Sequence, residues 1–136
     1  QKYRDFVEEH FEWIVPEDQG KWYHNEPNKG DENYEAMDAM YAFCAERDIT
    51  MRGHSIFWAV EKMVQEWVKA LDDAALRKAL ERRIASVVGR YAGKVVHWDV
   101  NNEMLHGSYF KDRLGDAIRP WIFQKMKEAD PDAMSF

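Results

Sequence analysis

Three clusters of polar side chains in this sequence are suited to acid–base chemistry and to binding a polar ligand. Carboxylates can transfer protons, the side chains of Asn, His and Lys can hydrogen-bond hydroxyl groups, and tryptophan offers a flat face to ring-shaped ligands. This combination suits carbohydrate chemistry, because cleavage of a glycosidic bond needs an acid to protonate the leaving oxygen and a second carboxylate. The clusters are Pro16-Glu17-Asp18-Gln19-Gly20-Lys21-Trp22, Arg52-Gly53-His54 with Trp58, and Asp99-Val100-Asn101-Asn102-Glu103 with Met104-Leu105-His106-Gly107.

Other kinds of site find less support in the sequence. The possible metal ligands are His54, Asp99, Glu103 and His106. Their spacing matches no close motif such as H-E-x-x-H, so we predict no metal site. The glycine-rich phosphate loops and the G-x-S-x-G elbow are both missing, so we expect neither a nucleotide site nor a serine hydrolase, and no cofactor. Cys44 falls on the apolar face of an expected helix, and we assign it to the packed core rather than to a nucleophilic role.

Apolar residues alternate along the chain between strand-like runs and helix-like spacing. The runs predict strands at Phe11–Val15, Ile49–Phe57 and Val95–Val100. Helical spacing predicts helices over Asn33–Asp48, from a cap at Asp72 or Asp73 to Gly93, and over Ile118–Ala129. A further helix precedes the first strand, and another strand can begin after Pro131. Residues assigned to the core include Ala36, Met40, Phe43, Cys44, Trp13, Trp98 and Trp121.

Strands that alternate with helices indicate a parallel α/β sheet, and two architectures of that class fit. One is a segment of a (β/α)₈ barrel, which needs about 250 residues when whole, so that 136 residues would form about half of it. The other is a doubly wound open sheet of three or four strands. In both, side chains that carry chemistry gather at the carboxyl ends of the strands, so the three polar clusters are expected to share one pocket.

Charge and composition exclude several partners. The chain has 19 basic and 25 acidic residues, a net charge of −6, and no basic face, so we expect no nucleic-acid partner. Its longest apolar run, Ile56–Val60, is far shorter than the roughly 20 residues that span a bilayer, so we expect no membrane partner. The first residues lack the apolar centre of a signal peptide, and the single cysteine allows no internal disulfide.

The three clusters together resemble a known enzyme family. The blocks Pro16-Glu17-x-x-x-Lys21-Trp22, Arg52-Gly53-His54-x-x-x-Trp58 and Trp98-Asp99-Val100-Asn101-Asn102-Glu103 resemble those of glycoside hydrolase family 10, the endo-β-1,4-xylanases. The likeness extends over Trp22-Tyr23-x-x-Glu26-Pro27 and Met104-Leu105-His106-Gly107-Ser108-Tyr109 and covers essentially the whole chain. It implies that residues 1–136 are part of a (β/α)₈ catalytic domain, roughly strands two to four with flanking helices and the start of strand five.

The resemblance also implies roles for individual residues in a retaining, two-glutamate mechanism on xylan or xylo-oligosaccharides. Glu103 matches the general acid/base, and Asn102 matches the amide that holds the sugar 2-hydroxyl. Glu17, Lys21, His54 and Trp58 match residues that line the glycone side of the cleft. The family implies secretion. Asp18 stands where the family usually has Asn, and the family's nucleophile, on the seventh strand, has no counterpart here.

Plainer interpretations stay open beside these roles. Glu103 could be a solvated carboxylate, and Trp58 could belong to the core. Lys21 and Glu17 could form a weak surface pair. The chain could also be a non-catalytic xylan-binding or assembly module, or an unrelated α/β protein. We expect it to need the remainder of the barrel or to self-associate, because a cut barrel exposes strand edges and leaves the inward faces of Val95 and Trp98 without partners.

Overall fold

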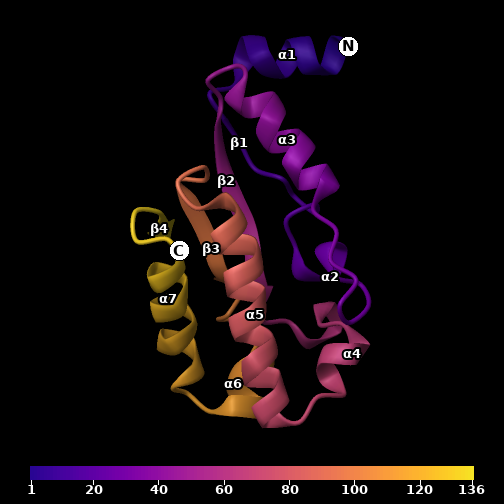
Figure 1. Ribbon diagram of the computed structural model, residues 1–136, viewed down its shortest axis with the longest axis vertical. Helices are drawn as coiled ribbons and strands as arrows, with labels where there is room; N and C mark the ends of the chain where they lie inside the picture. Colours follow the sequence, from indigo (N-terminus) through magenta and orange to yellow (C-terminus); the bar gives the residue numbers. More distant parts are fainter.

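The computed structural model describes residues 1–136 as four parallel strands with helices packed along one face of the sheet (Figure 1). The strands are β1 (Trp13–Ile14), β2 (Thr50–Trp58), β3 (His97–Asn102) and β4 (Met134–Ser135). The longer helices are α1 (Lys2–His10), α3 (Glu35–Ala45), α5 (Asp73–Tyr91) and α7 (Ile118–Ala129). Shorter helical turns are α2 (Trp22–Asn25), η1 (Glu61–Met63), α4 (Glu66–Lys69) and α6 (Tyr109–Leu114).

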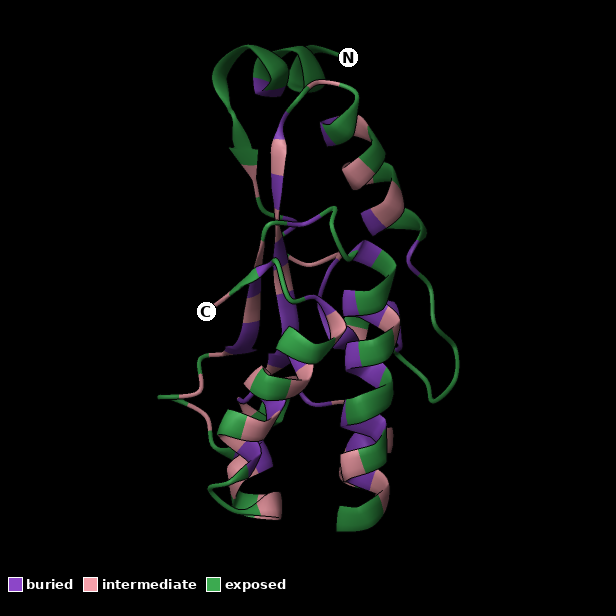
Figure 2. Cartoon of the chain, turned by 60° about the vertical axis from the view of Figure 1, so that its left-hand side comes forward, coloured by how far each residue is buried: buried purple, intermediate pink, exposed green.

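The topology is that of a barrel segment. The strand order is β1-β2-β3-β4, with every neighbouring pair parallel and no reversal of order. The helices α3 and α5 pack on β2, and α7 packs on β3, all on the same face (Figures 1 and 2). A doubly wound sheet carries helices on both faces and reverses its strand order. That alternative is therefore wrong.

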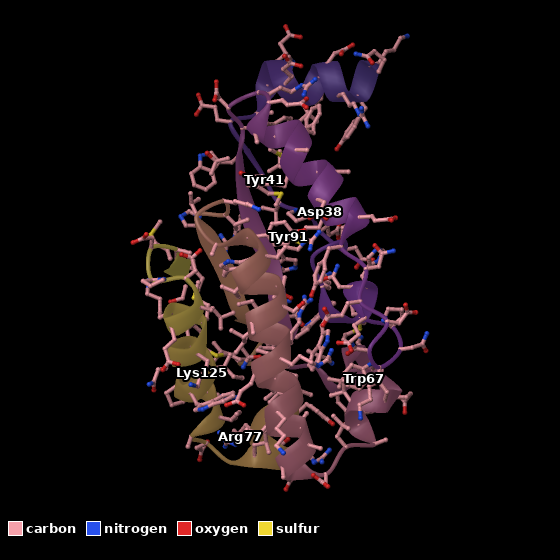
Figure 3. All side chains as sticks on the ribbon, in the orientation of Figure 1. Asp38, Tyr41, Trp67, Arg77, Tyr91 and Lys125 are labelled. Atoms are coloured by element: carbon pink, nitrogen blue, oxygen red, sulfur yellow. The ribbon has the colours of Figure 1, made fainter.

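The helix α5 packs on β2 and also contacts α6 and α7 within the helical layer. Its buried residues form one stripe, while the opposite side is exposed (Figure 2). The carboxylate of Asp72 caps it by accepting from the Ala75 amide at 2.8 Å, and Gly93 follows its end with φ +68°, as the sequence predicts. Asp38 ties α3 to α5 by accepting from the Tyr91 hydroxyl at 2.7 Å, and both side chains are marked in Figure 3.

The predicted strands differ from the observed ones at their ends. The first is only Trp13–Ile14, and the chain turns away at the buried Pro16, which has no amide for a sheet hydrogen bond. The third begins at His97 and continues through Asn101 and Asn102, rather than spanning Val95–Val100. It continues because Asn102 still pairs with β2, its carbonyl accepting from the Ala59 amide at 3.1 Å. Polar side chains therefore lie within this strand as well as after it.

Some core assignments need correction. Ala36 is exposed, and α3 buries Met37 and Cys44 instead. Cys44 lies in the core as predicted, where burial raises the pKa of its thiol. The sequence predicts Trp13 in the core, but 48% of it is exposed, with its indole stacked on the His97 ring at 4.8 Å between ring centres.

Trp98 is fully buried, as expected, but on the opposite face of the sheet from the one predicted. Its indole packs against the Tyr91 ring of α5, with the centroids 6.4 Å apart. It therefore faces the helical layer, not the barrel interior. Neighbouring side chains of β3 alternate, so Asp99 and Asn101 lie on the other face. Trp121 is half-buried against the same hydrophobic core, which also contains Val95.

Two further properties bear on ligands and surroundings. No helix of the chain has both the length and the apolarity that crossing a membrane requires. No group of three or more His, Cys, Asp or Glu side chains lies close enough together to hold a metal ion.

Candidate active site

The site lies at the carboxyl ends of β2 and β3, where the two strands stay paired to their last residues. Trp58 pairs in register with Asn102, one residue before Glu103. Beyond the strands, the Ala59 carbonyl accepts from the Tyr109 amide at 3.1 Å. At Gly107, a Cβ would lie 2.5 Å from the backbone of Ala59, so the segment after Glu103 packs directly on the end of β2. This close packing brings the second and third polar clusters to one edge.

Glu103, Trp58 and Lys21 meet at this edge although they come from three separate segments. The Trp58 Nε1 donates to Glu103 Oε2 at 2.9 Å, and the Lys21 Nζ lies 4.4 Å from the centre of the Trp58 ring. Trp58 is half-buried and lies outside the hydrophobic core, which argues against the core interpretation of this residue. The Glu103 carboxylate is exposed at the strand end, where a ligand can reach it.

The backbone at Glu103 adopts a conformation that is uncommon for a residue with a side chain. Its φ is +54°, in the left-handed region, and its carbonyl accepts from the amides of His106 and Gly107 at 2.9 and 2.8 Å. Such conformations cost about 1 kcal/mol or more and persist where the surrounding structure holds them, often at functional positions. The tight turn aims the Glu103 side chain toward Trp58.

Lys21 is held from its other side by Asp18 rather than by Glu17. The Lys21 Nζ lies 3.6 Å from Asp18 Oδ1, and Asp18 also accepts a hydrogen bond from the Tyr23 hydroxyl. That hydrogen bond, with the Lys21 charge, lowers the pKa of Asp18. Burial and the Asp18 carboxylate raise the pKa of Tyr23 to about 12. The Glu17 side chain is exposed and makes no hydrogen bond or ion pair, so the pairing of Lys21 with Glu17 is wrong.

His54 lies in β2 on the same face as Asp99 of β3, directly opposite it in the register. Its Nδ1 lies 2.8 Å from Asp99 Oδ2, which also accepts from Arg52 Nε at 3.1 Å. Burial raises the pKa of Asp99, but hydrogen bonds from His54 and Arg52 outweigh it, and the net pKa is lowered. The ionised carboxylate can only accept, so His54 donates from Nδ1 and keeps Nε2 for a ligand.

The structure therefore brings together three of the six site residues that the sequence singles out, while His54 pairs with Asp99 instead. Lys21, Trp58 and Glu103 form one contact chain, and Asn102 adjoins it as the register partner of Trp58. Glu17 stays apart on the surface. The sequence places Arg52 and Asp99 in the polar clusters but gives neither a role, because their contact depends on the register of two strands. The sequence offers only the Arg-Gly-His and Trp-Asp motifs as an indication of this contact, and these motifs do not determine the register between β2 and β3.

Ionisable side chains at the carboxyl ends of parallel strands, with helices between the strands, are typical of (β/α)₈-barrel enzymes, whose active sites lie at that edge. Comparison with known proteins identifies the family within this class. The family model described as glycosyl hydrolase family 10 matches residues 1–135. The chain therefore belongs to glycosyl hydrolase family 10, and the resemblance seen in the motifs is confirmed.

Relatives and solved structures give the same assignment. The chain is 47% identical to the anti-sigma-I factor RsgI6 of Acetivibrio thermocellus, over 98% of this chain and 18% of that protein. It is 42% identical to endo-1,4-beta-xylanase 1 of Arabidopsis thaliana, over 97% of this chain and 14% of that protein. Native xylanase 10B of Thermotoga maritima superposes with a TM-score of 0.90 at 28% identity, over 99% of this chain and 44% of that structure. A xylanase 10B of Thermotoga petrophila in complex with xylobiose superposes equally well, at 27% identity over 98% of this chain and 43% of that one.

The extent of these matches establishes the fold. The chain spans less than a fifth of the two relatives and less than half of the two solved structures. The fold is accordingly a segment of the family's (β/α)₈ barrel.

Proposed function

We propose that the protein containing this segment hydrolyses internal β-1,4-xylosidic bonds of xylan with retention, and that Glu103 is its general acid/base. The observation that carries the proposal is the position of Glu103 at the end of β3, exposed to a ligand and hydrogen-bonded by Trp58 at 2.9 Å. The similarity to proteins named endo-1,4-beta-xylanases supports the choice of xylan. Because polymeric xylan is found outside cells, we propose that the protein acts outside the cell.

The neighbouring side chains have complementary tasks in this mechanism. The Trp58 indole N–H holds the Glu103 carboxyl group in one orientation, which keeps its acid function aimed at the glycosidic oxygen. Lys21 and the free Nε2 of His54 can hydrogen-bond sugar hydroxyl groups, and we assign the same task to Asn102. We place Glu17 at the outer rim of the glycone side, since it is exposed.

A retaining mechanism also needs a carboxylate nucleophile about 5–5.5 Å from the acid/base. Two carboxylates of the polar clusters in this segment are already engaged. Asp99 is bound by Arg52 and His54, and Asp18 is bound by Lys21 and Tyr23. We therefore assign the nucleophile to a carboxylate outside residues 1–136.

The test is the Glu103→Gln variant of the full-length protein. Loss of the acid should lower turnover of natural xylan about 10²–10⁴-fold. An aryl xyloside whose leaving group needs little protonation should lose less in its first step. Glu61→Gln is a matched control, because Glu61 is exposed and its side chain makes no hydrogen bond. Unchanged xylan turnover in Glu103→Gln would refute the assignment.

A second candidate function is xylan binding without hydrolysis. One specific observation favours it: a relative at 47% identity is named an anti-sigma factor rather than a xylanase. Release of reducing sugar from xylan by the full-length wild-type protein separates the two functions. Tight binding of xylohexaose with no release of reducing sugar would select the binding module.

A further inference from the structure

The helix α5 places a fully buried cation directly beneath the site. Arg83 is completely inaccessible and makes no hydrogen bond with any carboxylate. Its guanidinium instead donates to five oxygen atoms. These are the carbonyls of Gly20 at 2.7 Å, Ile56 at 3.3 Å and Ser55 at 3.4 Å, the Asn25 Oδ1 at 3.0 Å and the Tyr34 hydroxyl at 3.2 Å. A buried charge is costly unless its hydrogen bonds are satisfied, so this arrangement tolerates little change.

The three carbonyls belong to the two segments that carry the site. Gly20 directly precedes Lys21, and Ser55 and Ile56 lie in the irregular part of β2 between His54 and Phe57. The two segments also touch each other. A Cβ at Gly20 would lie 2.2 Å from the His54 carbonyl oxygen, so their backbones are in contact at this point. Arg83 thus bridges the loop of Lys21 to the strand of His54 and Trp58.

Asn25 extends this bridge to the far side of the same loop. It is buried, its Oδ1 accepts from Arg83, and its Nδ2 donates to the carbonyls of Gln19 at 2.7 Å and Asn33 at 3.3 Å. The loop is therefore held by hydrogen bonds on both sides of Lys21.

We propose that Arg83 is a positioning residue that acts through its hydrogen bonds to Gly20, Asn25 and the β2 backbone, so that the Lys21 ammonium lies over the Trp58 ring beside Glu103. A planar guanidinium can serve these five acceptors at once, whereas a lysine ammonium has three donors on a single nitrogen. This inference rests on the proposed function only in the test that measures binding of a sugar ligand.

The first test measures the loop without any ligand. In the full-length protein, Arg83→Met removes the charge and all five hydrogen bonds, and Lys78→Met removes an exposed cation of the same helix as a control. Hydrogen exchange of the Lys21 and Asn25 amides, which bond to Asp18 and Lys21 carbonyls, should accelerate about tenfold or more in Arg83→Met. In Arg83→Met, the amides within α7 should exchange at wild-type rates. In Lys78→Met, the Lys21 and Asn25 amides should also exchange at wild-type rates. Unchanged protection of the loop would overturn the proposal.

The second test asks whether Arg83 acts through Lys21. Arg83→Met should weaken binding of xylotetraose about tenfold, the size expected for losing one hydrogen bond to a charged group. Combined with Lys21→Met, its effect should be smaller than the product of the two single effects, because the same contact is already lost. Independent, multiplying effects would mean that Arg83 acts only on general stability and would overturn the proposal. Arg83→Lys replaces Arg83→Met if the latter fails to fold, with loosening of the loop again expected.

The two tests separate the inference from the proposed function. If the wild-type protein binds no xylotetraose, the proposed function fails, and the exchange rates alone decide whether Arg83 holds the loop. If the wild type binds xylotetraose and Arg83→Met leaves both the binding and the exchange rates unchanged, the positioning role is wrong while the proposed function stands.

Discussion

Replacing Asp99 with Asn is the sharpest probe of the contact between β2 and β3 beneath the site. The substitution keeps size and shape but removes the charge that Arg52 and His54 share. Asp99 is mostly buried, with 15% of its side chain exposed, so water replaces little of what is lost. The Asn amide can still accept one hydrogen bond from Arg52, but its NH₂ group would face the His54 Nδ1.

The expected loss follows from these contacts. Hydrogen bonds to charged groups contribute about 1.5–3 kcal/mol each, and removing one partner of a buried pair costs up to about 5 kcal/mol. Because 34% of the Arg52 side chain is exposed and one hydrogen bond survives, the lower end applies. We expect Asp99→Asn to lower the free energy of unfolding by about 2 kcal/mol at pH 7.

Urea unfolding of the full-length protein as a function of pH provides the assay. The pKa of Asp99 is lowered from 3.8, so its contribution is fully present above pH 3.8 and is lost as the pH falls through the folded-state pKa. The stability difference between wild type and Asp99→Asn should therefore be constant near neutrality and shrink below about pH 4. Xylotetraose should also bind more weakly, because His54 loses the partner that orients it.

Asp31→Asn is the matched control, since Asp31 is exposed and its side chain makes no hydrogen bond. The reasoning would be refuted if Asp99→Asn unfolded at the same urea concentration as wild type at pH 7. A difference that grew on acidification would be equally damaging, because it would have the wrong sign for a lowered pKa.

Three other outcomes can be measured independently. Gly20→Ala should raise the Kd for xylotetraose about tenfold in titration calorimetry, because its Cβ would meet the His54 carbonyl, whereas Gly89→Ala, with open space around its Cβ, should not. Asp72→Ala should lower the free energy of unfolding by about 1 kcal/mol in urea, and Asp72→Asn, which keeps the capping acceptor, should lose less. The 136-residue polypeptide alone should self-associate, because β1 and β4 are outer strands beside exposed apolar side chains such as Trp13 and Val15. Sedimentation as a monomer only would contradict that expectation.

The elements with strong local signals could be predicted from the sequence. The helix Ile118–Ala129 has the predicted bounds, and the cap at Asp72 and the glycine at 93 mark the ends of α5 as expected. These signals are local, because a helix end depends on residues within one turn of it. The meeting of three polar clusters at one edge was also predictable, since parallel strands place their carboxyl ends together.

The predictions that were wrong concern contacts between residues that lie far apart in the sequence. Trp98 points toward the helices and Trp13 is exposed. Both placements depend on which face of its strand packs against the helical layer. Similarly, Asp18 rather than Glu17 pairs with Lys21 because the chain turns after Pro16, which composition does not reveal. The roles of Arg83 and Asp99 were invisible for the same reason. Their partners lie 27 or more residues away along the chain.

The register between β2 and β3 decides both the core and the site, and one glycine enforces it. Gly53 pairs directly with Trp98, and a Cβ at Gly53 would lie 2.3 Å from the indole ring. The indole therefore fits only where β2 has no side chain. Because side chains alternate, a slip by one residue would turn Trp98 into the polar face and Asp99 into the helical layer. The same close contact that buries the Trp98 indole thus places Asp99 opposite His54. Packing on one face of the sheet therefore sets the geometry of the polar side chains on the other.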